Sequence, residues 1–234
     1  LRLLQRIRRV SSVALSFDDL VRCPTPCDLA ALVRERENRD SHAERLESPA
    51  EPEPLEKLSR SKTWPATENQ LVYWKVITGS KGKATGNIVR PMRVRGGFNS
   101  ELFGQAFRAV INRHESLRTG LKEDAKGVVV QKIIRRFRVP VTIETLPEIP
   151  SRRRQTECIR RADQEGKEPF DLGRPPLIRA KIVVFDSDDH LLMICVNHAV
   201  ADGTSLGIIW DDLIKAYGAL VDGREPELED LPFQ

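Results

Sequence analysis

The chain has 234 residues, 40% of them hydrophobic, and its 38 Lys and Arg against 34 Asp and Glu give a net charge of +4. This length can bury a sizeable core, as one large domain or two smaller ones, but the longest apolar run, residues 191–196, is far shorter than the roughly 20 residues that a transmembrane helix needs. Positive and negative charges nearly balance, and the basic clusters 135–138 and 151–154 do not lie in a nucleic-acid-binding motif, so nucleic acid is not the expected partner. Both clusters are predicted to lie on solvated faces of helices or loops.

Residues 1–36 are predicted to form short helices. Apolar residues recur at helical spacing at positions 1, 4, 7 and 10, and Ser16 with Asp19 resembles a capping box that opens a second helix. Thr25 as N-cap, with Pro26 at the first helical position, predicts a third helix with residues 29, 32 and 33 on one side. The stretch has no signal-peptide pattern and no initial Met, so we expect a piece of a longer polypeptide.

Residues 37–60 are charged and rich in proline, with few large apolar side chains, which predicts an interdomain linker. From residue 61 strands alternate with helices, which indicates an α/β or α+β domain. Residues 87–94 and 127–134 are predicted strands. Between them an amphipathic helix is indicated by apolar positions 103, 106, 107, 110 and 111.

The second half repeats this rhythm. Residues 177–185 alternate as a strand, and residues 190–196 are nearly continuously apolar, as expected of a strand buried on both faces. After a break at Gly203 a long helix is predicted, with Thr204 or Ser205 as N-cap. Its core-facing positions are 206, 209, 210, 213, 214, 217 and 220.

Asn197 and His198 follow the buried strand directly, and Asp202 precedes Gly203. Strand ends are where α/β folds place their sites. A histidine there can act as a base, an acid or a hydrogen-bond donor near neutral pH. The spacing alone is also common among structural histidines, so it does not identify a site by itself.

Four ordered motifs resemble those of the condensation domains of nonribosomal peptide synthetases. The segment 197–203 (NHAVADG) is similar to the His-His-x-x-x-Asp-Gly signature, and 67–74 (TENQLVYW) resembles the opening motif with its Gln and Trp. The segment 113–119 (RHESLRT) is similar to Arg-His-Glu-x-Leu-Arg-Thr, and 169–180 resembles the segment that leads into the central strand.

Residues 17–30 also resemble the last helices of a phosphopantetheine carrier domain, without its Gly-x-Ser attachment motif. The resemblance implies an all-α carrier remnant over 1–36, a linker over 37–60 and, over 61–234, the N-terminal lobe of a condensation domain. That lobe is expected to have the α/β fold of chloramphenicol acetyltransferase, a mixed sheet with flanking helices. The second lobe of the domain is expected to be missing from this chain.

The resemblance assigns the catalytic role to His198. Asn197 stands where the family usually has a first His; it can hydrogen-bond but cannot titrate, so we expect it to orient and not to transfer protons. Asp202 is expected to hold the loop by pairing with Arg118 or Arg113, and Gly203 to give a tight turn or a close backbone approach.

The implied reaction is the attack of an acceptor amine, tethered as an aminoacyl thioester, on a donor thioester. His198 would either deprotonate the amine or orient it and stabilise charge. The implied partners are upstream and downstream carrier domains, whose phosphopantetheine arms tether the substrates, an adenylation domain and the second lobe. Two other functions stay open: a non-catalytic domain that docks carriers, and an acyltransferase of the same superfamily that uses acyl-CoA.

No bound cofactor or metal is expected. Cys23, Cys27 and His42 are followed by no second pair at zinc-like spacing, and four cysteines without a secretory signal favour the cytoplasm. Cys195 is expected to be buried and structural, because burial raises the pKa of a thiol. For Tyr73 and Trp74 we expect packing roles, whereas His114 is as readily structural as functional.

Overall fold

A computed structural model of the chain describes residues 11, 13, 19, 22, 23, 25–40, 63–80 and 85–231. The chain divides into two compact units, Leu1–Glu56 and Lys57–Gln234, and the boundary between them lies inside the predicted linker. No helix within the described ranges is long and apolar enough to cross a membrane.

The first unit contains α3 (Pro26–Asp40), which begins where the sequence predicts. The hydroxyl of Thr25 accepts the N–H of Asp28, as an N-cap should. Leu29 packs with Val13, and Arg36 pairs with both carboxylate oxygens of Asp19, at 3.0 and 2.7 Å. The helix predicted at 1–10 and the capping box at Ser16 lie outside the described residues.

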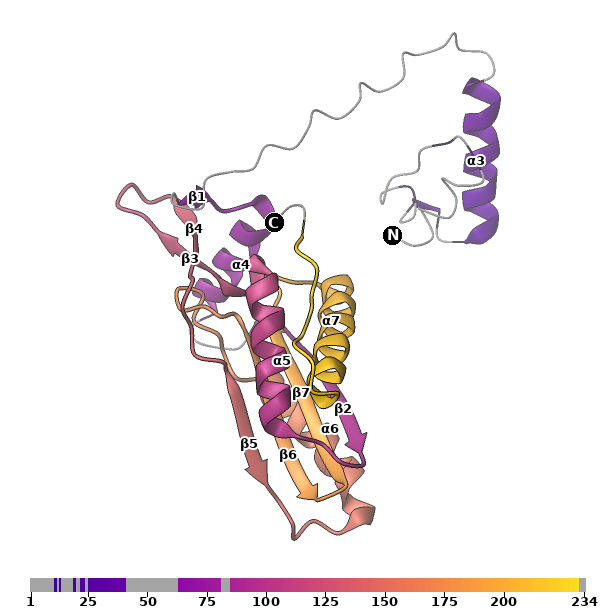
Figure 1. Cartoon of the computed structure of the whole chain (residues 1–234). Coiled ribbons are helices and arrows are strands. Elements are labelled where there is room, and N and C mark those ends of the chain that lie inside the picture. The colour runs from indigo at the N-terminus through magenta and orange to yellow at the C-terminus, as the bar shows by residue number, and fades with distance from the viewer. Residues whose placement is uncertain are drawn as a thin grey trace. The chain divides into compact units, whose positions relative to one another are not determined.

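The second unit is built on a four-stranded mixed sheet, in the order β2 (Asn87–Arg95), β7 (Asp189–Asn197), β6 (Ile178–Asp186) and β5 (Val141–Thr145). The β5–β6 pair is parallel and the other two pairs are antiparallel. Figure 1 shows α5 (Ser100–Arg113) and α7 (Gly203–Val221) side by side against this sheet, with α6 (Ser151–Gly166) behind it. The predicted fold, a mixed sheet with flanking helices, is confirmed.

Strand β7 is buried along its whole length because each face of the sheet is covered. Leu192, Ile194 and Val196 belong to the main core with α5 and α7. Leu191 and Met193 belong to a second cluster with Cys158 of α6. Successive side chains of a strand point to opposite faces, so a continuous apolar run is what a strand between two helical layers requires.

Helix α5 buries the five residues that its sequence pattern predicts: Phe103, Ala106, Phe107, Val110 and Ile111. Helix α7 buries most of the predicted positions but not Ile214, which is 62% exposed, so that prediction was wrong. The N-cap prediction for α7 was also wrong, because the cap is Asp202 and not Thr204 or Ser205.

A smaller antiparallel sheet and a short helix complete the unit near the end of β7. The sheet has the order β1 (Trp64–Pro65), β4 (Val129–Ile133) and β3 (Thr119–Glu123), and β3 follows the 3-10 helix η1 (Glu115–Arg118). The helix is α4 (Glu68–Gly79), which the capping box between Thr67 and Gln70 opens. It places the predicted opening motif beside the predicted His motif, because Tyr73 reaches His198.

The two basic clusters differ in environment. Arg135, Arg136 and Arg138 are exposed, as predicted. Arg154 was predicted to be solvated, but it is 8% exposed and lies 2.8 Å from the carboxylate of Asp189. That arginine neutralises a buried acid, because an unpaired carboxylate is costly in the interior.

Candidate active site

The candidate site lies where β7 ends and the chain turns toward α7. The N–H of Asn197 donates to the carbonyl of Leu177, and the N–H of His198 donates to the carbonyl of Gly86 at 2.7 Å. The backbone at Asn197 and His198 is therefore held by residues next to both neighbouring strands, β6 and β2. A loop of five residues, 198–202, then leads to α7.

The imidazole of His198 is half-buried and stacks on the ring of Tyr73, with ring centroids 5.0 Å apart and planes inclined by 7°. Gly86 makes room for this pair. Its φ of +71° favours glycine, and a Cβ there would lie 3.2 Å from the Tyr73 ring. Within the described part of the chain, no group hydrogen-bonds either ring nitrogen of His198.

Asn197 is 1% exposed, and its amide is fully used. The Nδ2 donates to Oδ1 of Asn87 at 3.1 Å and to the carbonyl of Thr85 at 3.4 Å. Its Oδ1 accepts the N–H of Ala199 at 3.0 Å. These contacts hold the backbone on both sides of His198.

Asp202 does not form the predicted ion pair with Arg118 or Arg113. Its carboxylate is exposed and accepts the N–H and the hydroxyl of Ser205, each at 2.7 Å. These hydrogen bonds lower the pKa of Asp202. The prediction of the partner was wrong, because the acid caps α7 and meets the unpaired N–H groups of the first helical turn instead of an arginine.

The carboxylate that meets the 113–119 segment is Asp212, in the middle of α7. Its Oδ2 lies 2.7 Å from Nε2 of His114 and 3.1 Å from Nε of Arg113. Asp212 is buried, so its charge needs a compensating partner, which the guanidinium of Arg113 supplies. This cluster joins the C-terminal end of α5 to α7 and gives His114 a structural contact.

Arg118 folds back on its own segment. It donates to the carbonyls of Ile134 and Asn112 and pairs with Glu115 at 3.1 Å. It therefore ties η1 to the residue after β4. Neither Arg118 nor Arg113 is brought to His198 by a contact that the structure describes.

Gly203 is the first residue of α7, and its backbone does not adopt the left-handed conformation. A Cβ at this position would meet no atom within 4 Å. The backbone of Gly203 therefore makes no left-handed turn, and no described residue approaches it closely. The glycine that the local backbone does require is Gly86.

The cysteines are thiols without disulfide partners. Burial raises the pKa of Cys195 to about 11 and also raises that of Cys158, so neither thiol forms the nucleophilic thiolate near neutral pH. Cys23 and Cys27 lie in the first unit, and His42 is outside the described residues. No group of three potential metal ligands occurs in the ranges that the structure describes.

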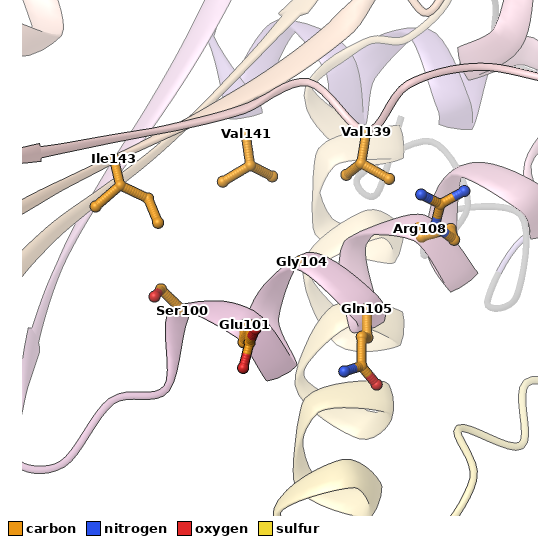
Figure 2. Close-up of a pocket in the computed structure, with 8 residues that line it drawn as sticks. All are labelled: Ser100, Glu101, Gly104, Gln105, Arg108, Val139, Val141 and Ile143. Atoms are coloured by element: carbon orange, nitrogen blue, oxygen red, sulfur yellow. The ribbon is translucent and has the colours of Figure 1, made fainter.

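An open groove of about 350 Å³ lies between α5 and the edge strand β5. Figure 2 shows Val139, Val141 and Ile143 along one side and the α5 residues from Ser100 to Arg108 along the other. Two strands separate β5 from β2, and none of the predicted site residues lines this groove.

Four residues were missed by the sequence analysis. Tyr73 was expected only to pack, and Gly86, Asn87 and Asp212 were not singled out. Tyr73 belongs to the opening motif, which is the one signal that points to it. Asn87 and Asp212 carry no signal in a single sequence, because their partners lie far away along the chain.

The model of the family described as "Condensation domain" matches residues 61–234. A plipastatin synthase subunit of Bacillus subtilis (strain 168) is 32% identical over 226 residues, which are 95% of this chain and 8% of that protein. A linear gramicidin synthase subunit of Brevibacillus parabrevis is 30% identical over 229 residues, 98% of this chain and 4% of that protein.

Solved structures share the fold. The first condensation domain of the calcium-dependent antibiotic synthetase, in complex with a substrate analogue, matches with a TM-score of 0.64 and 22% identity over 71% of this chain and 40% of that one. The X-domain from teicoplanin biosynthesis matches with a TM-score of 0.66 and 29% identity over 76% of this chain and 37% of that one. The chain thus spans less than a tenth of the two synthase subunits and less than half of these solved chains.

Proposed function

Because the chain belongs to the condensation domain family, we propose that it supplies the His198-bearing lobe of a domain that forms amide bonds between carrier-tethered substrates. The observation that carries this proposal is the placement of His198. Its backbone is fixed at the end of a buried strand, its ring is held against Tyr73, and its ring nitrogens are left for a substrate.

In the proposed reaction the amine of an aminoacyl thioester attacks the carbonyl of a donor thioester. A C–N bond forms, the C–S bond breaks, the donor arm leaves as a thiol, and the amine loses one proton. A thioester is already activated, so the protein has to align the two tethers and assist that proton. His198 either accepts the proton or hydrogen-bonds the amine and stabilises charge.

Asn197 keeps the loop in place and does not titrate, so the acid–base role in this proposal belongs to His198 alone. Asp202, Arg113 and Arg118 are assigned to structure, since each is engaged away from the imidazole. Gly203 stands at the start of α7, where a Cβ would meet no atom within 4 Å.

The proposed partners follow from the reaction. The substrates would arrive on the phosphopantetheine arms of an upstream and a downstream carrier domain, with an adenylation domain in the same assembly line. Residues 1–36 would be the end of a carrier domain and 37–60 its linker; the alignment over 95% of the chain, which extends well before residue 61, supports this. The unpaired cysteines suit a reducing compartment, and we propose the cytoplasm.

A second lobe is also part of the proposal, because the matched solved domain is much longer than the part this chain covers. The chain alone is then expected to form no amide bonds, because one wall that aligns the tethers would be absent.

The test is an assay of the complete domain with donor-loaded and acceptor-loaded carriers, followed by mass spectrometry of the acceptor carrier. A mass increase equal to the donor acyl group supports the proposal. Transfer from acyl-CoA and not from a donor carrier would identify an acyltransferase. Carrier binding without transfer would identify a docking domain, and either result would overturn the proposal.

A further inference from the structure

We infer that Asn87 is a positioning residue for His198, and that it acts through the side chain of Asn197. The expected effect on catalysis rests on the proposed function. The positioning of His198 by Asn87 does not, because it follows from the contacts of the chain itself. Asn87 is the first residue of β2 and Asn197 is the last residue of β7, and the two face each other in the antiparallel ladder.

The direction of every hydrogen bond in this pair is determined by its surroundings. The Nδ2 of Asn87 donates to two backbone carbonyls, of Glu168 at 2.7 Å and of Gly166 at 3.1 Å. Carbonyls only accept, so the amide of Asn87 cannot be flipped, and its Oδ1 must face Asn197. Asn197 must then present Nδ2 to Asn87, which leaves its Oδ1 to accept the N–H of Ala199.

The hydrogen bonds between Asn87 and the carbonyls of Gly166 and Glu168 are held in place by further contacts. The carbonyl of Glu168 also accepts a hydrogen bond from Nη2 of Arg179 at 2.9 Å. The guanidinium of Arg179 lies over the ring of Phe170, 4.2 Å from its centroid. Arg179 pairs in turn with the buried carboxylate of Glu165, which also binds Lys181 at 3.1 Å. These contacts fix the C-terminal end of α6 against β6, and Asn87 of β2 joins this fixed end to Asn197.

At its other end, this series of hydrogen bonds holds the residues on both sides of His198. Asn197 precedes it and Ala199 follows it, and both are held by one side-chain amide. The neighbour of Asn87 in sequence, Gly86, accepts the N–H of His198 and borders the Tyr73 ring. Loss of the Asn87 side chain would remove the shorter of the two hydrogen bonds that Nδ2 of Asn197 donates. The amide of Asn197 would then be held less firmly, and the imidazole would lose its fixed place on Tyr73.

The experiment is NMR of the His198 imidazole in the full chain, with its signals assigned by their loss in His198→Ala. Stacking on Tyr73 shifts these proton signals upfield in the unmodified chain. Asn87→Ala is expected to reduce this shift by half or more, and Asn197→Ala to do the same. Because Asn87 acts through Asn197, the double variant should reduce the shift no further than Asn197→Ala alone.

Two additional variants keep the result interpretable. Ile182→Val, in the buried core, lowers stability without changing the hydrogen bonds of Asn87 and Asn197, so it should leave the His198 signals in place. Asn87→Asp keeps the side-chain volume and replaces Asn87→Ala if that variant fails to fold. Its carboxylate would face the carbonyls of Gly166 and Glu168 and could not donate to them. It should therefore shift the His198 signals in the same direction as Asn87→Ala. Unmoved signals in the folded Asn87 variants, or additive effects in the double variant, would overturn the inference.

Catalysis provides a separate readout. In the complete domain, Asn87→Ala should lower kcat for amide formation about 10-fold, with KM for the loaded carriers unchanged, because a displaced base costs rate and not carrier binding. If the NMR coupling is found and the unmodified domain forms no amide, the positioning stands and the proposed function fails. If the domain forms amide and Asn87→Ala leaves kcat unchanged, the positioning role fails.

Discussion

The imidazole of His198 lies face to face with the phenol ring of Tyr73, with centroids 5.0 Å apart and planes inclined by 7°. Tyr73 comes from α4 and His198 from the end of β7, so this contact joins the first and the last of the motifs that the sequence analysis singled out. The two rings restrict each other, and Gly86 leaves the space that they need.

Replacing Tyr73 by Leu should lower the rate of amide formation in the complete domain about 10-fold, because the ring that orients the imidazole is lost. Tyr73→Phe keeps the aromatic face and should stay within about 2-fold of the unmodified rate, since no contact of the hydroxyl is involved in the stack. Single-turnover kinetics of both variants provide the measurement. Equal rates for Tyr73→Leu and Tyr73→Phe would show that the stack does not position His198.

Replacing Asp202 by Ala should lower the free energy of unfolding by about 1 kcal/mol, the usual cost of losing an N-cap. Asp202→Asn keeps an oxygen that can accept the N–H of Ser205 and should retain most of the stability. Urea denaturation of the chain measures both. A loss of about 3 kcal/mol or more, the cost of breaking a buried ion pair, would indicate that Asp202 has a charged partner after all.

Asp212→Ala should destabilise the chain much more, by about 3 kcal/mol, because Arg113 and His114 would lose the buried carboxylate that they share. The neighbouring Asp211 is exposed and offers a matched control. Asp211→Ala should change the free energy of unfolding by less than about 0.5 kcal/mol. Denaturant curves that show similar losses for the two variants would contradict the assignment of Asp212.

Stability should fall as the solution is acidified. Hydrogen bonds from Arg160 and Arg161 lower the pKa of Glu157 from 4.5 to about 2, and Arg93, then Arg154, lower the pKa of Asp189 from 3.8. A folded-state pKa below the unfolded value means that these acids stabilise the chain above the unfolded pKa, and that the contribution is lost as pH falls through the folded pKa.

Urea midpoints measured between pH 7 and pH 2 should therefore decline below about pH 4.5. Asp189→Asn should be less stable than the unmodified chain at pH 7, because Arg93 and Arg154 lose the buried charge between them, and its decline with acid should be shallower. Midpoints that are constant or rise on acidification would contradict the account of these ion pairs.

Periodicity predicted the elements that carry the core. The five buried positions of α5 and the two-faced burial of β7 are direct consequences of residue spacing, so a single sequence contains them. The partner of Asp202 was not predictable in this way. An aspartate before a helix can cap its first turn or pair with a distant arginine, and spacing alone does not distinguish the two.

The site was predictable as a position and not as a set of contacts. The strand end and the motif order indicated His198, but its neighbours Tyr73, Gly86 and Asn87 come from α4 and the start of β2, which only the folded chain brings together. Ile214 shows the same limit in the core, since it follows the helical pattern of α7 and yet no element of the described chain covers it.

The proposal that His198 assists amide formation is tested most directly by single-turnover kinetics of the complete domain with loaded carriers. His198→Ala should reduce the rate of amide formation about 100-fold or more, the scale of general acid–base catalysis. Asn197→Ala, which removes an orienting amide and no titratable group, should reduce it less. A rate for His198→Ala within about 2-fold of the unmodified domain, or a larger loss for Asn197→Ala, would contradict the assignment of His198.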